Sequence, residues 1–216
     1  MTLIVSVLHL DRKAVKALRM TDLYSLHRVV YSLYDDVRSE AEKSASGCSG
    51  IQFADMGGDF HGRKVLLLAN RAPAEQVKGD DGERYGEVQS KAVPERFLEH
   101  DRYRFKVIVN PTRRDNKSKN LVPVKGREDI AAWFCGRALS SWGFTVPEMY
   151  LQIDTVEVQR FSSKNGHPIT LAQAHLQGEL HVRDGEKFRQ SFGQGIGRGR
   201  TFGCGLLQLI PVSDAL

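Results

Sequence analysis

The expected order of strands and helices runs through this chain twice, and few folds accommodate such a repeat. In the first half, hydrophobic periodicity predicts helices at 22–37 and 73–77 and strands at 3–10, 51–54, 64–69 and 85–93. In the second half, it predicts helices at 127–142 and 186–194 and strands at 102–109, 152–161, 171–182 and 206–210. Each half is β-α-β-β-α-β, the split βαβ order of ferredoxin-like domains. The sequence therefore predicts an α+β fold of two tandem ferredoxin-like domains, residues 1–97 and 98–216.

Size and charge are compatible with a nucleic-acid-binding protein. The chain has 216 residues, enough for two small domains, and a Ser/Gly-rich linker is expected at 44–50. Its 31 Lys and Arg exceed its 26 Asp and Glu, and the net charge of +5 favours phosphate-rich partners. No apolar run is long enough to span a membrane, and no signal peptide is visible, so we expect a cytoplasmic protein. Three scattered cysteines suggest neither a disulfide framework nor a zinc site.

The most distinctive segment is 195–207, Gly-Ile-Gly-Arg-Gly-Arg-Thr-Phe-Gly-Cys-Gly-Leu-Leu. Glycine has no Cβ to hold a phosphate away and adopts positive φ easily, so this loop suits a polyanion. It lacks the Gly-Lys-Ser/Thr ending of a Walker A loop. A dinucleotide-binding fold would require a strand directly before the loop, and none is expected there. The alternative is a plain glycine-rich turn with solvated arginines. The expected phosphate contacts are Gly195, Gly197, Arg198, Gly199 and Arg200.

The first long helix holds the residues best suited to chemistry. Its apolar stripe, expected to face the core, consists of Leu23, Leu26, Val30, Leu33 and Val37. A second stripe, expected at the edge of the core, consists of Tyr24, His27, Tyr31 and Tyr34. Tyr24 and His27 are three residues apart and hence neighbours, and an imidazole beside a phenol suits proton transfer. Alternatively, the tyrosines cover the core edge and His27 is an ordinary surface histidine.

Two other segments concentrate positive charge. The loop 111–120 contains Arg113, Arg114, Lys117 and Lys119, and the expected hairpin 159–166 contains Arg160 and Lys164. A basic hairpin can enter a groove of duplex RNA, whereas the alternative is a pair of solvated loops. The remaining histidines lack the spacing of a helical metal pair, so we expect no metal site and no cofactor.

Three of these segments together resemble one known family. They are 195–207, the helix start Asp-Leu-Tyr-Ser-Leu-His at 22–27, and the strand 103–111 with Arg113 and Lys117 after it. In these segments the chain is similar to the CasE family of CRISPR-associated endoribonucleases, and the resemblance covers nearly the whole chain. That family cuts CRISPR repeat RNA at the base of a stem-loop without metal, and stays on the product as a subunit of the Cascade complex.

The resemblance implies a function and a site. The chain would be a metal-independent endoribonuclease with CRISPR repeat RNA and other Cascade subunits as partners. His27 would be the general acid or base and Tyr24 its partner while a 2′-hydroxyl attacks the adjacent phosphorus, leaving a 2′,3′-cyclic phosphate. Two alternatives remain: a non-catalytic RNA-binding subunit of the same complex, and a protein that binds a small phosphorylated ligand in its glycine loop.

Overall fold

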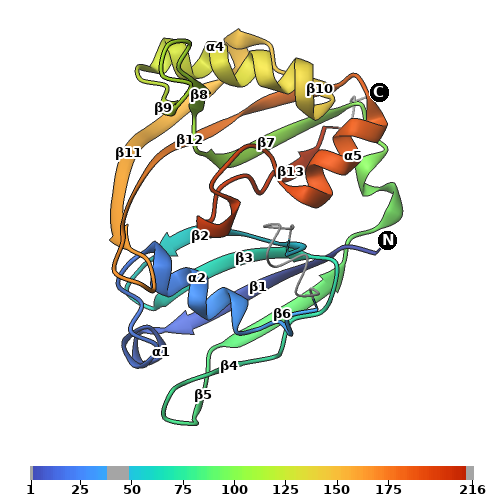
Figure 1. The fold of residues 1–216 in the computed structure, drawn as a ribbon. Helices are drawn as coiled ribbons and strands as arrows, with labels where there is room; N and C mark the ends of the chain where they lie inside the picture. Colours follow the sequence, from blue (N-terminus) through green and yellow to red (C-terminus); the bar gives the residue numbers. More distant parts are fainter. Residues whose placement is uncertain (1, 38–48, 213–216) are drawn as a thin grey trace. The chain divides into compact units, whose positions relative to one another are not determined.

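The computed structural model describes residues 2–37 and 49–212. The chain forms two compact units, one of Met1–Val93 with Thr201–Gly203 and one of Pro94–Arg200 with Cys204–Leu216. Each unit has its own main sheet (Figure 1). Most of the expected linker at 44–50 lies outside the described residues. The assignment of domains to 1–97 and 98–216 stays a prediction.

The first unit is built on a four-stranded antiparallel sheet. Its elements are β1 (Ile4–Asp11), α1 (Arg12–Ala17), α2 (Leu23–Tyr31), β2 (Ile51–Gly58), β3 (Gly62–Ala69), β4 (Val77–Lys78), β5 (Arg84–Tyr85) and β6 (Glu87–Ala92). The strand order β2-β3-β1-β6 places the first strand between the third and the last, as in a ferredoxin-like sheet. Alternation along β1 buries Leu8 and Leu10, which pack with Leu26 and Val30 of α2 in an aliphatic core.

The predicted helix at 73–77 is wrong. This segment is irregular and leads into a hairpin of β4 and β5, whose turn is closed by a hydrogen bond from Gly79 N to Glu83 O. Hydrogen bonds from Ala74 N to Leu33 O and from Val88 N to Glu75 O hold it against neighbouring segments, and Val77 is buried. A proline start and only five residues gave a helix too little local stability against these contacts.

Helix α2 is also shorter than the predicted range 22–37. It ends at Tyr31, and its C-cap Ser32 donates its hydroxyl to Val29 O. Leu26 and Val30 of the predicted apolar stripe are buried, whereas Val37, beyond the helix, is 65% exposed. Had the helix continued to Val37, Asp35 and Asp36 would lie in its last turn, where the dipole is negative and carboxylates are unfavourable.

The second unit contains all six predicted elements and additional ones. Its strands are β7 (Arg102–Val109), β8 (Thr112–Arg114), β9 (Leu121–Pro123), β10 (Phe144–Thr145), β11 (Gln152–Ser162), β12 (Pro168–Val182) and β13 (Gln208–Pro211). Helix α4 (Arg127–Arg137) continues as a π-helical segment, Ala138–Trp142, and stops at Gly143 with φ 80°, as predicted. Helix α5 spans Gly185–Gln194. The last strand was predicted at 206–210, but β13 begins two residues later, at Gln208. Leu206 and Leu207 are buried without being part of the strand.

The main sheet of the second unit has the same order as that of the first. It runs β10-β12-β7-β13, and β11 pairs with another part of β12. Its core is aromatic: Phe105 stacks on Phe134 of α4 with ring centroids 5.6 Å apart, and Phe144 meets Phe188 of α5 edge-on at 6.0 Å. The two units therefore confirm the prediction of tandem ferredoxin-like sheets, with a hairpin in the first unit where a second helix was expected.

Candidate catalytic site

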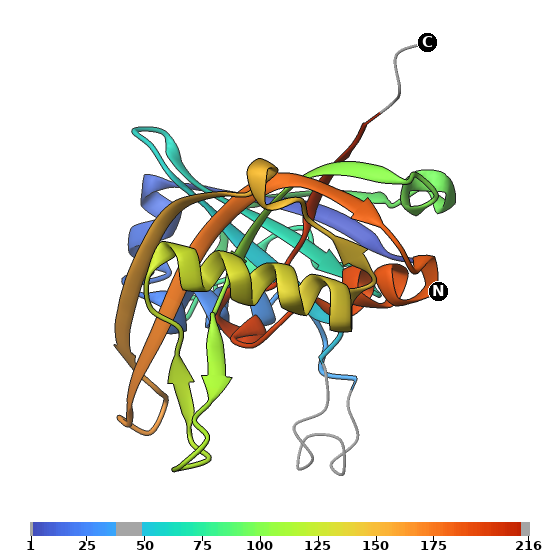
Figure 2. The same ribbon diagram turned by 90° about the horizontal axis from the view of Figure 1, so that it is seen from above.

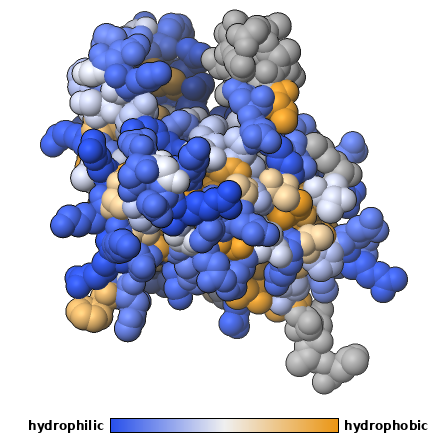
Figure 3. Space-filling view, turned by 90° about the horizontal axis from the view of Figure 1, so that it is seen from below, coloured by the Kyte–Doolittle hydropathy of each residue, from blue (hydrophilic) through white to orange (hydrophobic). Residues whose placement is uncertain are grey.

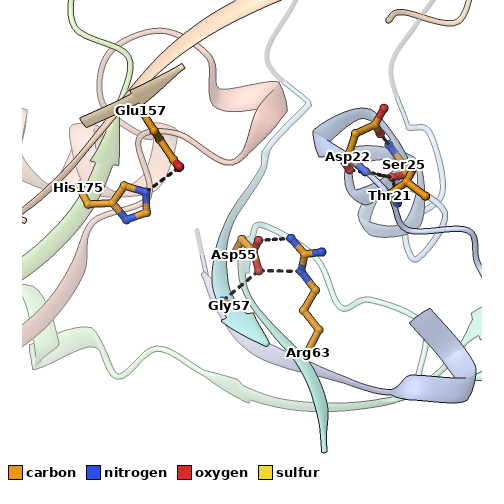
Figure 4. A network of polar contacts seen from close by, with 8 residues as sticks. All are labelled: Thr21, Asp22, Ser25, Asp55, Gly57, Arg63, Glu157 and His175. Atoms are coloured by element: carbon orange, nitrogen blue, oxygen red, sulfur yellow. Dashed lines mark hydrogen bonds and ion pairs between the residues drawn. The ribbon is translucent and has the colours of Figure 1, made fainter. Parts of the chain in front are cut away.

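The start of α2 is fixed by a capping box, which sets the position of Tyr24 in the first turn and of His27 one turn after it. Ser25 N donates to Asp22 Oδ1 at 2.8 Å, and Ser25 Oγ accepts from Thr21 N and Asp22 N, both at 2.9 Å (Figure 4). These bonds satisfy backbone donors that a helix N-terminus otherwise leaves unpaired. The sequence Thr-Asp-Leu-Tyr-Ser therefore begins the helix at one defined residue.

His27 is half-buried and held by the C-terminal segment assigned to the first unit. Its Nδ1 lies 3.0 Å from the carbonyl oxygen of Thr201, and its ring centroid lies 5.8 Å from that of Phe202. A carbonyl only accepts hydrogen bonds, so Nδ1 carries the proton and Nε2 is the nitrogen that can exchange a proton with a substrate. Thr201 and Phe202 thus orient the imidazole. Catalytic histidines are in general oriented by such a neighbouring group.

Burial lowers the pKa of His27 from its usual value, and the hydrogen bond to the Thr201 carbonyl partly offsets this by favouring the protonated ring. The sign follows from the charged state, since desolvation disfavours imidazolium. His27 is therefore mostly neutral near pH 7, with Nε2 able to accept a proton. A histidine in this state suits a general base better than a fixed positive charge.

Two tyrosines lie beside His27, and a third does not. The Tyr24 ring centroid lies 6.1 Å from that of His27, and the Tyr31 ring lies 4.1 Å away on the next turn. The Tyr31 hydroxyl is 2.9 Å from Ser49 Oγ, so this residue is tied to the strand side of the unit. Tyr34, expected at the core edge, is buried instead, and burial raises its pKa to about 12. Of the three tyrosines, Tyr24 is thus the one whose hydroxyl is neither bonded to Ser49 nor buried, and it can act on a substrate.

The glycine-rich loop shows why glycine is required there. All five glycines of 195–205 have positive φ, between 70° and 89°. A Cβ on Gly205 would lie 2.3 Å from Ile196 O, and one on Gly203 would lie 3.0 Å from the Phe53 ring, so these two serve packing. A Cβ on Gly197 would meet nothing within 4 Å. Of the glycines expected to contact phosphates, Gly197 is therefore at an open position, whereas a Cβ on Gly199 would lie 3.2 Å from Cys204 Sγ.

The two arginines of this loop differ in their contacts. Arg198 is exposed, and its backbone forms an isolated bridge with Asn110 after β7. Arg200 is half-buried, and its guanidinium donates to Gln194 O at 2.8 Å across the loop. Arg198 is the arginine more available to a ligand, while Arg200 also closes the loop on the end of α5.

The predicted basic loop 111–120 is a β-hairpin. Strands β8 and β9 pair, and Asp115 Oδ1 accepts from Lys117 N and Ser118 N in the turn. Arg114 donates to Lys119 O at 3.1 Å, and Lys119 has φ 58°. The four predicted cations are exposed on this hairpin: Arg113, Arg114, Lys117 and Lys119.

The hairpin predicted at 159–166 is confirmed. Strands β11 and β12 pair over 152–177, and their turn is closed by Ser163 N to His167 O and Gly166 N to Ser163 O. Arg160 and Lys164 are exposed near this turn. Farther along the strands, His175 Nε2 lies 3.4 Å from Glu157 Oε1, drawn in Figure 4. Figure 2 shows both hairpins extending past α4.

The structure divides the predicted site residues into two sets. Tyr24 and His27 lie together in the first unit, while the predicted RNA contacts lie in three separate segments of the second. Sequence reasoning missed Thr201 and Phe202 as partners of His27, although both lie within the glycine segment. The only available signal was an aromatic residue between glycines, since a backbone carbonyl leaves no mark in a sequence.

A cluster of metal ligands and a membrane-spanning helix are both absent from the part of the chain that the structure describes. Within 2–37 and 49–212, no three His, Cys, Asp or Glu side chains are grouped to hold a metal ion. No helix in the same ranges combines the length and hydropathy that a membrane span needs. On the face shown in Figure 3, hydrophilic side chains surround a smaller hydrophobic area.

Comparison with known proteins gives consistent matches. A family model described as CRISPR associated protein matches residues 3–211. A CRISPR endoribonuclease Cse3 bound to a 19-nucleotide RNA superposes with a TM-score of 0.79 at 22% identity, covering 98% of this chain and 100% of that one. Cse3 of Thermus thermophilus, bound to an RNA representing a pre-cleavage complex, gives 0.76 at 21% identity over 98% and 100%. A chain of a CRISPR RNA-guided surveillance complex gives 0.66 at 20% over 97% and 100%. No curated protein sequence matches significantly.

Proposed function

The chain belongs to the family of CRISPR-associated proteins, and we propose that it is an endoribonuclease that cleaves CRISPR repeat RNA at the base of a stem-loop. The observation that carries this is the orientation of His27: Thr201 fixes the proton on Nδ1, and Nε2 is left for the substrate next to Tyr24. The full-length similarity to RNA-bound Cse3 supports the same substrate class.

The proposed reaction needs only groups of the RNA and of the protein. The 2′-hydroxyl oxygen bonds to the adjacent phosphorus, and its proton passes to His27 Nε2. The bond from phosphorus to the 5′-oxygen breaks, and Tyr24, the neighbouring phenol, donates a proton to that leaving oxygen. The products are a 2′,3′-cyclic phosphate and a 5′-hydroxyl, so no metal ion is required to supply the nucleophile.

The exposed cations of the second unit fit the role of holding the RNA. We propose that Arg198 and the loop 195–199 contact phosphates, together with the cations of the β8–β9 hairpin. The hairpin of β11 and β12, with Arg160 and Lys164, has the shape to enter a groove. A chain of a surveillance complex is among the similar structures, and we propose that this protein also stays on its product as a Cascade subunit.

The test is cleavage of the cognate repeat RNA in excess EDTA. We expect cutting at one position, with a 2′,3′-cyclic phosphate on the upstream product. The matched control is the same RNA with a single 2′-deoxynucleotide at the cut position, which removes the nucleophile and should block the reaction without weakening binding. Loss of all cleavage in EDTA with recovery on adding a divalent ion would contradict the mechanism. Tight binding without any cleavage would favour the non-catalytic RNA-binding subunit.

A further inference from the structure

The first unit contains cavities that the proposed catalytic site does not use. Two cavities of about 540 Å³ each adjoin the turn between β2 and β3. Their volume lies within the range of small-ligand sites. They share the residues Gly58, Asp59, Gly62 and Arg63, and one of them is also lined by Arg12, Lys16, Arg19 and Thr21. A small-molecule-sized space thus lies among three cations on or next to α1 and the turn of a hairpin.

An exposed aromatic ring stands at this turn. The side chain of Phe60 is 75% exposed, and the guanidinium carbon of Arg12 lies 4.8 Å from its ring centroid. The His61 ring meets Phe60 edge-on, with centroids 5.7 Å apart. A phenylalanine this exposed gains nothing from the core. Proteins that bind single-stranded nucleic acids present aromatic rings beside arginines, because any base can stack on such a ring.

The cavity lined by Arg12, Lys16 and Arg19 offers positive charge that is available to a ligand. Arg12, Lys16 and Arg19 are exposed, and within the described part of the chain none of them forms an ion pair. Arg63, in contrast, is held by Asp55 through two hydrogen bonds, drawn in Figure 4, which fix the wall of the cavity.

One carboxylate lies among these cations. Asp59 accepts from His61 N and Gly62 N, and these bonds lower its pKa. An ionised carboxylate repels a bare phosphate but accepts hydrogen bonds from N–H groups on the edge of a base, the N3–H of uracil included. The cations therefore suit the phosphates, the flat ring suits the face of a base, and the carboxylate suits the edge of a base.

The cavity adjoins the helix of the catalytic pair. Thr21, which lines it, donates its backbone N–H to Ser25 Oγ at the start of α2. From the N-cap Asp22 to His27 is five residues, or about 7.5 Å of helix at about 1.5 Å per residue. This is roughly the length of two stacked nucleotides at about 3.4 Å each. A strand whose scissile phosphate lay at His27 would reach the cavity within a few nucleotides.

We propose that Phe60 and the cavity beside Arg12, Lys16 and Arg19 bind single-stranded nucleotides that flank the cleaved phosphate. This rests on the proposed function and adds to it a second RNA contact, made by the first unit. Phe60 stacks a base, and the three cations hold the phosphates on either side of it.

The experiment compares three RNAs: the bare cognate stem-loop, and the same stem-loop extended by ten uridines at the 5′ or the 3′ end. For wild type, we expect one extension to raise the affinity. Phe60→Ala should reduce the affinity for that RNA by about 5- to 150-fold, the range that loss of one base stack gives. Affinity for the bare stem-loop should stay unchanged. Phe60→Trp should keep the gain, whereas Phe60→Leu, which lacks a ring, should not.

The cations are tested on the same RNAs. Arg12→Ala, Lys16→Ala and Arg19→Ala should each lower the salt dependence of binding to the extended RNA by about 0.7 in log–log slope, the single-strand value. Lys78→Ala, an exposed cation of β4 outside the cavity, and Tyr150→Ala, an exposed aromatic of the second unit, are matched controls and should change nothing.

Each outcome decides between defined alternatives. If wild type cleaves the bare stem-loop but no extension raises affinity, or if Phe60→Ala keeps the full gain, the inference is overturned and the proposed function stands. If wild type neither binds nor cleaves the bare stem-loop, the proposed function fails and this inference fails with it. A gain that Phe60→Ala and the cation variants abolish, with Phe60→Trp retaining it, supports the proposal.

Discussion

The two units arrange their strands in the same order but fill their cores with different residues. The first unit packs mostly aliphatic side chains under its sheet and has a short hairpin where a second helix was expected. The second unit keeps both helices and packs Phe105, Phe134, Phe144 and Phe188 together in its core. The shared strand order therefore depends on alternating apolar residues in the strands rather than on a fixed set of helices or one type of core side chain.

The difference also separates two roles. In the first unit, α2 packs on the sheet with one stripe and presents Tyr24 and His27 with another. In the second unit, α4 and α5 pack against the main sheet through Phe134 and Phe188, and the β8–β9 and β11–β12 hairpins carry exposed cations. We accordingly expect changes at Tyr24 and His27 to affect the chemical step, and changes at the cations or the core of the second unit to affect RNA affinity or stability.

The largest expected loss of stability comes from the aromatic core. Phe134→Ala removes a fully buried ring and should lower the free energy of unfolding by about 3–5 kcal/mol. The chain has two tryptophans, Trp133 and Trp142, and both lie in the second unit, so urea unfolding followed by tryptophan fluorescence reports that unit. Leu139→Ala, at a side chain that is 64% exposed, is the control and should cost less than about 0.5 kcal/mol. A loss below about 1 kcal/mol for Phe134→Ala would contradict the core described here.

Substitution of two glycines of the loop, Gly205 and Gly197, should lower the free energy of unfolding by different amounts. Gly205→Ala places a Cβ 2.3 Å from a backbone oxygen at φ +89°, and should cost about 2–4 kcal/mol through strain and displaced backbone. Gly197→Ala meets open space, so only the cost of left-handed φ remains, about 1–2 kcal/mol. Thermal unfolding of both variants measures this difference. Equal losses would mean that packing does not distinguish the two glycines.

The cations of the second unit should act on binding alone. Arg198→Ala and Arg160→Ala should each lower the slope of log affinity against log salt by roughly 0.7–0.9 while the rate of bound RNA cleavage stays unchanged. We expect Arg198→Ala to weaken cognate and scrambled hairpins equally, and Arg160→Ala to weaken the cognate more. Salt titrations with Lys78→Ala as the control test this, and slopes equal to wild type would make these clusters solvated loops.

The smallest effect concerns pH and stability. The pKa of His27 is lower in the folded protein than in the unfolded chain, so the unfolded state binds more protons below about pH 6.5, the ordinary pKa. Wild type should therefore lose stability relative to His27→Gln as the pH falls from 7 towards 5, and the two should run parallel above pH 7. Urea midpoints across this range measure it. A difference between them that does not change with pH would show that burial does not disfavour imidazolium.

Most of the fold was predictable from local patterns. The strand at 102–109 and the helix stop at Gly143 follow directly from alternation and from glycine after a helical run. The helix at 73–77 was not predictable, because contacts with Leu33 and Val88 decide that segment and no local pattern records them. For the same reason α2 ended early, since its apolar stripe continued to Val37 in the sequence but not in the packing.

The sequence was enough to predict the catalytic side chains, but not the groups that hydrogen-bond to them. The spacing of Tyr24 and His27 indicated their proximity on one helix. The Thr201 carbonyl lies 174 residues away in the sequence and is a backbone atom, so no residue type could have signalled its hydrogen bond with His27. Phe60 showed no periodicity at all, because its exposed position in a turn depends on the pairing of β2 with β3.

The most direct test of the account is the single-turnover cleavage rate of His27→Ala on the cognate stem-loop, measured together with its affinity. Proton transfer by one positioned side chain contributes about 10²- to 10⁴-fold, so the rate should fall by that factor while affinity stays close to wild type. His100→Ala, an exposed histidine of the second unit, is the control and should cleave normally, and Tyr24→Phe should lose less than His27→Ala. An unchanged rate in His27→Ala would contradict the central claim that this histidine performs the chemistry.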